Sequence, residues 1–142
     1  MATVFDVSAF ILKEMGPMSA MKLQKLVYYS QAWSLVWDEE PLFPERIEAW
    51  ANGPVCPQLY REHKGQFQVT KLARGKASNL NQDQRETVEA VLAKYGKKSA
   101  PWLSELTHKE RPWKRARRGV PNGVRSSATI SHAEMAEYYG GL

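Results

Sequence analysis

A length of 142 residues is typical of one compact domain, and a hydrophobic content of 43% excludes an intrinsically disordered chain, so we expect a single domain over residues 1–142. The single cysteine excludes an intrachain disulfide, and no apolar run approaches the roughly 18 residues of a membrane span, which favours a cytoplasmic protein without membrane contact. The net charge of +5 is unevenly placed, since residues 1–63 carry five Lys/Arg and eight Asp/Glu whereas residues 64–142 carry fifteen and seven.

The first part of the chain predicts two helices. Residues 3–15 place apolar side chains at spacings of three and four, which is one helical face, and Gly16-Pro17 ends this pattern. Residues 19–37 contain no Gly or Pro, offer Ser19 as an N-cap, and are apolar around most of the helix circumference. Such a helix must be surrounded by others, so we expect it to be the central helix of the fold.

Two lysines lie near the start of this helix, at Lys22 and Lys25. The helix macrodipole disfavours cations at that end by several tenths of a kcal/mol, roughly up to 1. Two interpretations follow. The lysines keep this end of the helix in solvent, or they contact an acidic partner.

Prolines interrupt the segment 41–57, so no long element is expected there. Residues 46–50 fit either a short strand or a helical turn, and residues 52–54 predict a sharp turn. Any β structure is expected as one short pairing of residues 46–50 with residues 66–70. Pro57 can occupy the first turn of a short helix.

The second part of the chain predicts three further helices. They begin at the candidate caps Asn81, Ser99 and Ser131, and Gly96 and Pro112 limit the first two. In the second of these helices we expect Trp102, Leu103 and Leu106 to be buried. The predicted fold class is therefore mainly all-α, a compact bundle of about five to seven helices around the central helix at 19–37.

No catalytic, cofactor or metal site is expected, and we predict that the protein is not an enzyme. His63, His108 and His132 are far apart and lack the spacing of metal ligands, and no nucleophile–base pair or phosphate-binding glycine loop is present. His108 falls in the last turn of a predicted helix. A role as a cap or hydrogen-bond anchor is favoured there over a role as a general base.

The segment 109–125 is the most basic part of the chain, with seven basic residues and one acidic residue. The basic side chains at its start are Lys109, Arg111, Lys114, Arg115, Arg117 and Arg118. They could form a solvated face, contact phosphates while Trp113 stacks on an unpaired base, or contact an acidic protein. Trp113 could equally be an anchor in the core, and composition does not separate these interpretations.

Three stretches, in this order along the chain, resemble the Panacea domain of SocA-like and GepA-like proteins. They are MKLQKLVYYSQAW (21–33), PLFPERIEAWANGPVCPQLY (41–60) and LTHKERPWKRAR (106–117), and the resemblance extends over about residues 5–139. It implies a bacterial or prophage-encoded cytoplasmic antitoxin that neutralises a toxin by direct protein binding. The toxin is expected from the adjacent gene. Two alternatives remain, an adaptor that delivers the toxin to a ClpXP-type protease and a nucleic-acid-binding prophage regulator that uses residues 109–125.

The resemblance assigns a set of family-like residues, which we expect to be largely structural. They are Leu23, Leu26, Tyr29, Trp50, Gly53, Pro54, Val55, Tyr60, Leu106, Thr107, His108, Pro112 and Trp113. A second set is expected to contact the partner. It comprises Lys22, Lys25, Tyr28, Lys114, Arg115, Arg117 and Arg118.

Overall fold

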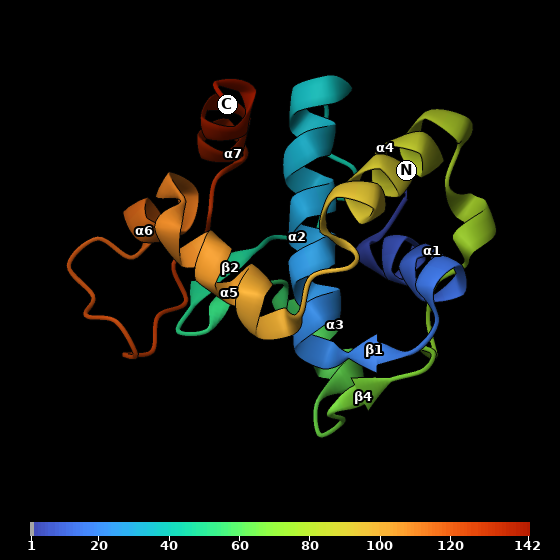
Figure 1. The fold of residues 1–142 in the computed structure, drawn as a ribbon, viewed down its shortest axis with the longest axis horizontal. Helices are drawn as coiled ribbons and strands as arrows, with labels where there is room; N and C mark the ends of the chain where they lie inside the picture. The colour runs from blue at the N-terminus through green and yellow to red at the C-terminus, as the bar shows by residue number, and fades with distance from the viewer. Residues whose placement is uncertain (1) are drawn as a thin grey trace.

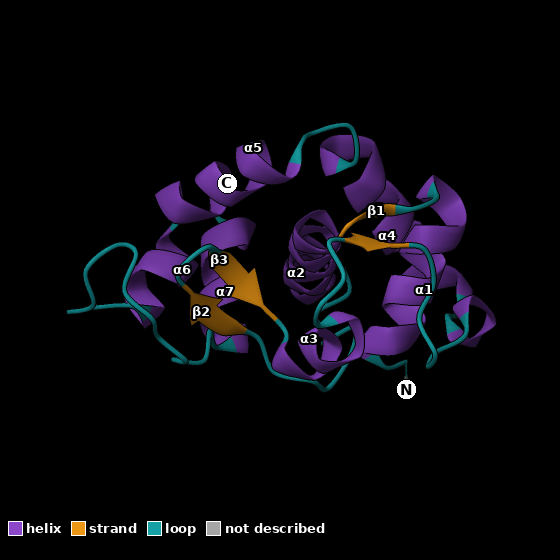
Figure 2. Cartoon of the chain, turned by 90° about the horizontal axis from the view of Figure 1, so that it is seen from below, coloured by secondary structure: helices purple, strands orange, loops and turns teal. Residues whose placement is uncertain are grey.

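The computed structural model describes residues 2–142, which fold mainly as helices around one central helix (Figure 1). The helices are α1 (Val4–Met15), α2 (Ala20–Trp37), α3 (Pro57–His63), α4 (Gln82–Tyr95), α5 (Ala100–Lys109), α6 (Arg111–Ala116) and α7 (His132–Gly140), with a 3-10 turn η1 (Ala77–Asn79). Figure 2 looks nearly along α2, with the other helices arranged around it. The predicted mainly α-helical bundle around residues 19–37 is confirmed.

The ends of the first two helices follow from local hydrogen bonds, and the predicted end at Gly16 and cap at Ser19 are confirmed. At the start of α1, the Thr3 hydroxyl accepts from the Asp6 backbone N–H while the Asp6 carboxylate accepts from the Thr3 N–H. Gly16 ends α1 with a φ of 82°, in the left-handed region that glycine adopts without strain. Ser19 caps α2 by accepting from the Lys22 N–H.

Two buried amides on α2 hold the proline-rich segment that follows it. The Gln31 amide donates to the Phe43 carbonyl and accepts from the Leu42 N–H. The Gln24 carbonyl oxygen accepts from the Cys56 N–H at 2.9 Å. Because each amide satisfies backbone groups that no helix or sheet would satisfy, the irregular segment can cover the central helix without leaving those groups unpaired.

The structure contains two short antiparallel sheets, and the predicted β pairing is wrong. The strands are β1 (Met18–Ser19) with β4 (Gln68–Val69) and β2 (Glu48–Trp50) with β3 (Gly53–Val55). Residues 46–50 and 66–70 therefore each contain a strand, but the two segments do not pair with one another.

The local hairpin β2–β3 replaces the predicted pairing for a geometric reason. Ala51 and Asn52 form a two-residue turn between Trp50 and Gly53, and Gly53 adopts a φ of 120°. A hairpin closed over two residues loses less loop entropy than a pairing across about 16 residues. The free edge of β2 is covered by the later segment, since Glu48 bridges to Thr129.

Four aromatic and acidic side chains connect α2 to α6 and α7 inside the protein. The buried Glu110 carboxylate accepts hydrogen bonds from the hydroxyls of Tyr29 and Tyr139, both at 2.7 Å. The Tyr139 hydroxyl also lies 3.0 Å from that of Tyr28. Burial raises the pKa of Glu110, and the tyrosine hydrogen bonds act in the opposite direction.

Replacing Tyr139 with phenylalanine is expected to lower the free energy of unfolding by about 1–3 kcal/mol, because the buried Glu110 carboxylate then loses one of its two donors. Urea denaturation at pH 7 measures the change. Tyr138→Phe is the matched control, since the Tyr138 hydroxyl makes no hydrogen bond within residues 2–142. Equal effects of the two substitutions would show that the Glu110 network does not contribute to stability.

Candidate functional site

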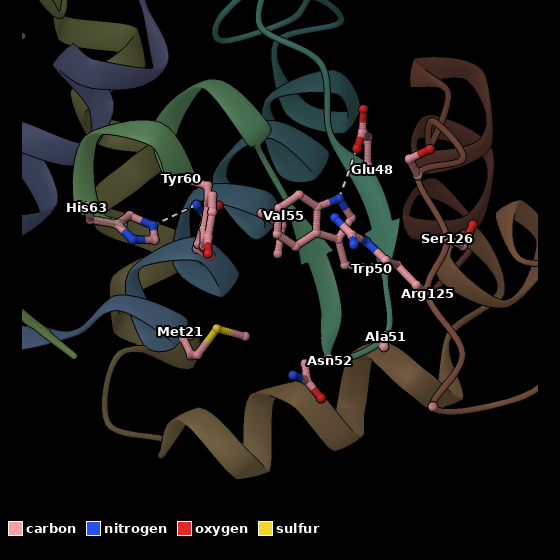
Figure 3. A pocket seen from close by; sticks show the side chains of 13 residues that line it. Met21, Glu48, Trp50, Ala51, Asn52, Val55, Tyr60, His63, Arg125 and Ser126 are labelled. Atoms are coloured by element: carbon pink, nitrogen blue, oxygen red, sulfur yellow. Dashed lines mark hydrogen bonds between the residues drawn. The ribbon is translucent and has the colours of Figure 1, made fainter. Parts of the chain in front are cut away.

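A pocket of about 430 Å³ opens beside the first turn of α2 (Figure 3). Its walls come from α2, the hairpin β2–β3, α3 and the loop 123–127, so segments far apart in the sequence meet around it. Pockets of this size hold a small ligand or an anchoring side chain of a partner.

Aromatic side chains from the middle family-like stretch form one side of this pocket. The rings of Trp50 and Tyr60 meet edge to face at 5.1 Å, and Tyr60 meets His63 in the same way at 5.4 Å. The Trp50 indole N–H donates to the Glu48 carboxylate at 2.9 Å. The Trp50 carbonyl accepts from the Trp113 indole at 2.8 Å, so both ends of Trp50 are fixed.

The floor of the pocket is polar and uncharged. The Gln24 amide donates to Nε2 of His63 at 2.9 Å and to the Cys56 carbonyl at 3.3 Å. Gln24 and His63 are both buried, and burial lowers the pKa of His63. His63 is therefore the neutral tautomer that accepts at Nε2, which leaves it poorly suited to act as a base at this position.

Arg125 is the free charge at the pocket. The Glu48 carboxylate, which also lines it, pairs with Arg46 at 2.8 Å and accepts from Trp50. Arg125 is exposed and makes no ion pair within the described part of the chain. The pocket is thus positive at its rim, although it contains one carboxylate.

Arg117 was expected to contact a partner, but the structure places it inside the protein with 3% of its surface exposed. Its guanidinium donates to the carbonyl of Ala49 at 3.0 Å, to that of Pro121 at 3.0 Å, and to that of Val124. A planar guanidinium with several donors suits this use, because it donates at once to one carbonyl of β2 and to two carbonyls of the loop that follows α6. Arg117 therefore positions the loop that carries Arg125.

Lys25 and Tyr28, also expected to contact a partner, are fully buried. Their positions on α2 point into the bundle, where Tyr28 meets Tyr139 and Lys25 lies against Gly53. Gly53 has a φ of 120°, a conformation that other residues rarely adopt, and a Cβ there would also lie 2.5 Å from Cε of Lys25. The backbone conformation and this contact together explain why a glycine follows the hairpin turn. The burial of Lys25 and Tyr28 corrects the surface role expected for both residues.

Three buried side-chain nitrogen atoms have no hydrogen-bond partner among residues 2–142, namely Nζ of Lys25, Nε2 of His108 and Nε of Arg117. Burial lowers the pKa of Lys25 to about 7. Burial also lowers the pKa of His108, and the nearby charges of Lys25 and Arg117 lower it further. His108 is consequently neutral at pH 7.

The third family-like stretch forms a stack of side chains instead of a helix cap. The His108 ring lies 4.0 Å from the Trp113 ring at an angle of 14°, and the Arg117 guanidinium lies 4.9 Å from the same indole. His108, expected to act as a hydrogen-bond anchor, instead stacks on the ring of Trp113. Trp113 is 3% exposed. Of the two roles that the sequence allows, a stacking platform for a base and an anchor in the core, the structure therefore shows the anchor.

The basic segment is less free than its composition indicates. Arg111 pairs with Glu134 at 3.0 Å and with Glu137 at 3.5 Å, and Arg115 lies 3.6 Å from Glu134. The Glu134 side chain therefore turns toward α6, while its backbone N–H donates to the Ser131 hydroxyl, which confirms Ser131 as the cap of α7. Of the expected contact residues, those with exposed or half-exposed side chains are Lys22, Lys114, Arg115 and Arg118.

The family-like residues divide into interior positions and positions at the surface. The buried ones are Leu23, Leu26, Tyr29, Gly53, Pro54, Val55, Thr107, Pro112 and Trp113, and the half-buried ones are Trp50, Tyr60, Leu106 and His108. The sequence assigns no role to Gln24, Glu48 or His63 and includes Arg125 only within the basic segment 109–125. Nothing in the spacing of these four residues indicates that they meet at one pocket.

The prediction that Trp102 is buried is wrong, since 44% of its surface is exposed. It lies in the first turn of α5, where the Lys98 ammonium sits 4.6 Å from its ring. Ser104, two residues later, donates to the Asn52 carbonyl at 2.6 Å and so places this turn beside the hairpin. Phe67 is another exposed aromatic residue, at 84%.

Within the described part of the chain, no group of three His, Cys, Asp or Glu side chains is placed to hold a metal ion. No helix among residues 2–142 has the length and apolarity needed to cross a bilayer.

The structure is thus a small, mainly helical fold with a pocket lined by aromatic, neutral polar and two charged side chains. The chain belongs to the SocA-like antitoxin family, Panacea domain, whose sequence model matches residues 23–114. It is 34% identical over 110 residues to Antitoxin SocA of Caulobacter vibrioides (strain NA1000 / CB15N). That alignment covers 68% of this chain and 58% of the relative, so the chain spans little more than half of the relative's length. No solved structure matches the chain.

Proposed function

We propose that this protein is an antitoxin that binds its cognate toxin directly and blocks it, and that the adjacent gene encodes the toxin. The observation that carries the proposal is the family match over residues 23–114, a range that includes most of α2, the hairpin, α3, α4, α5 and most of α6. The pocket is built on these same elements, with the loop 123–127 added. The matched part of the chain thus contains most of the site described above.

The chemistry of the site supports binding over catalysis. His63 is held as a neutral acceptor by Gln24, and the Lys25 and His108 nitrogens are enclosed in the protein. A general base must reach its substrate within hydrogen-bond distance. The groups at the open side of the pocket, Trp50, Tyr60 and Arg125, are of the kinds enriched at protein interfaces.

Co-expression tests the proposal. The adjacent gene's product, expressed alone from an inducible promoter, is expected to stop colony formation, and co-expression of this protein is expected to restore it. Blocking further predicts that the toxin stays at constant abundance and co-purifies with this protein. A harmless neighbour, or one equally toxic with and without this protein, would contradict the proposal. A fall in toxin abundance that depends on a ClpXP-type protease would instead indicate the adaptor role.

The nucleic-acid alternative has fewer free cations than the sequence suggested, because Arg111 and Arg115 pair with acids and Arg117 is buried. We expect no binding of a DNA duplex of the operon's promoter at about 50 mM salt, measured by fluorescence anisotropy. Several phosphate contacts would give measurable binding at this salt concentration and a steep loss at higher salt. Such a result would favour a role in regulation.

A further inference from the structure

We propose that the pocket beside the first turn of α2 receives a large aromatic side chain from an acidic segment of the partner. That the partner is a toxin rests on the function proposed above. The walls, floor and rim of the pocket favour this occupant whatever the identity of the partner. The pocket is then the centre of the interface, and Arg125 is the residue that recognises the charge of the partner.

The dimensions of the pocket suit a single anchoring side chain. Its volume of about 430 Å³ exceeds what one aromatic side chain fills, so the side chain can enter together with part of its backbone. Residues that dominate the energy of an interface are typically aromatic side chains in such pockets. A buried aromatic side chain removes about 150–250 Å² from water, which makes it the most favourable occupant of this kind.

The arrangement of the walls favours an aromatic side chain over a nucleobase. Trp50 and Tyr60 are inclined at 66° to each other, so they offer an edge and a face instead of two parallel faces. Aromatic side chains pack well edge to face, at centroid distances of about 4.5–7 Å. Proteins that bind single-stranded nucleic acid present open faces for stacking and several cations along the backbone.

The floor permits an apolar occupant without leaving a charge buried. Gln24 and His63 bond to each other, so neither loses its main hydrogen bond when water leaves the pocket. Neutral His63 adds no charge to desolvate, and Glu48 keeps both Arg46 and the Trp50 indole as partners. The desolvation cost of filling the pocket is therefore small.

The charge at the rim indicates what surrounds the aromatic side chain. Arg125 lines the pocket, is exposed and has no ion pair among the described residues. Acidic residues beside the anchor would complement this cation and accelerate association. A basic flank would face uncompensated repulsion.

Two exposed aromatic residues lie on the elements next to the pocket. Trp102 stands in the first turn of α5, which Ser104 joins to the hairpin turn, and Phe67 precedes β4, where its carbonyl accepts from the Ala20 N–H. Exposed apolar groups around a pocket extend the area from which a partner can exclude water. The docking surface thus continues beyond the pocket on both sides.

A short peptide tests the pocket chemistry without the toxin. The probe is an acetylated, amidated pentapeptide with a central tryptophan and two acidic residues on each side, compared with the same peptide carrying lysines. The NMR signal of the Trp50 indole N–H is expected to shift when the acidic peptide is added. Titration of both peptides is expected to show at least fivefold weaker binding of the lysine peptide. No shift with the acidic peptide, or tighter binding of a thymidine oligonucleotide at Trp50, would overturn the inference.

Two variants and one matched control locate the contact. Ser127→Trp places a ring in the pocket and is expected to abolish peptide binding, and Arg125→Glu is expected to weaken it at least fivefold. Lys13→Glu makes the same charge reversal at an exposed position on α1, outside the pocket lining, and is expected to bind as the unaltered protein does. Thermal melting confirms that each variant folds. Equal binding by Arg125→Glu and Lys13→Glu would overturn the role of Arg125.

Co-expression with the adjacent gene's product separates this inference from the proposed function. If the unaltered protein restores growth and Ser127→Trp and Arg125→Glu restore it equally well, the inference is overturned while the antitoxin role stands. If the unaltered protein does not restore growth, the antitoxin role fails, and the peptide measurement alone decides the chemistry of the pocket. Loss of rescue in both pocket variants, with Lys13→Glu still protective, supports both.

Discussion

Replacing Trp113 with alanine is expected to lower the free energy of unfolding by about 3–5 kcal/mol, the range typical of removing a buried aromatic side chain. The indole stacks on His108 at 4.0 Å and lies beneath the Arg117 guanidinium. Its N–H donates to the Trp50 carbonyl at 2.8 Å. The substitution leaves a cavity, removes both ring contacts and leaves that carbonyl without its donor.

Trp113→Phe separates these contributions, because phenylalanine keeps a ring in the stack but has no N–H to donate. We expect roughly half the loss of the alanine variant, and urea denaturation followed by circular dichroism measures both. The hydrogen bond to Trp50 also fixes the hairpin at the pocket, so both variants are expected to broaden the Trp50 indole signal in NMR. An alanine variant as stable as the unaltered protein would contradict the role of Trp113 as the core anchor of this end.

The helices were predictable because their signals are local. Thr3 and Ser19 are caps next to apolar periodic segments, and Pro57 and Gly96 mark a start and an end. The strands were not predictable as pairs, since a strand of three residues carries too little periodicity to indicate its partner. The two-residue turn before Gly53 decided the pairing of β2.

The candidate site was predictable only in part. The family-like stretches include Trp50 and Tyr60, which line the pocket, but the pocket also needs Gln24 from α2 and Arg125 from the late loop. Neither Gln24 nor Arg125 occurs in a sequence pattern that distinguishes it from an ordinary surface residue. Their meeting depends on tertiary packing, which one sequence does not reveal.

The largest errors concern side chains whose chemistry usually places them in water. Lys25 and Arg117 are cations and were assigned to the surface, yet both are buried. The two cases differ physically. Arg117 donates to three carbonyls from two of its guanidinium nitrogens, and only its Nε is without a partner among residues 2–142. Nζ, the single polar side-chain atom of Lys25, has no partner at all among these residues, so the burial of the lysine is the less compensated of the two.

Lys25→Met is therefore expected to stabilise the protein, by about 1–4 kcal/mol at pH 6, because methionine fills a similar volume without a charge to desolvate. The gain should depend on pH. Burial lowers the pKa of Lys25 to about 7 in the folded state, whereas the unfolded chain has the ordinary lysine value of about 10.4. Between these values the unfolded state binds more protons, so the stability of the unaltered protein rises with pH relative to the variant.

The expected result is a stability difference that is largest below pH 7, falls through pH 7 to 10 and is smallest above that window. Urea denaturation of both proteins at pH 6, 7, 8 and 9 measures it, and the subtraction removes the titrations of His63 and His108, which the two proteins share to first order. Because Lys25 also lowers the pKa of His108, that pKa should rise in the variant, as followed by NMR. A constant difference, or a destabilised variant, would mean that Lys25 is compensated in the folded protein. A stabilised variant that no longer neutralises the toxin would show that this lysine is retained for function, since it then costs stability at neutral pH without contributing to the fold.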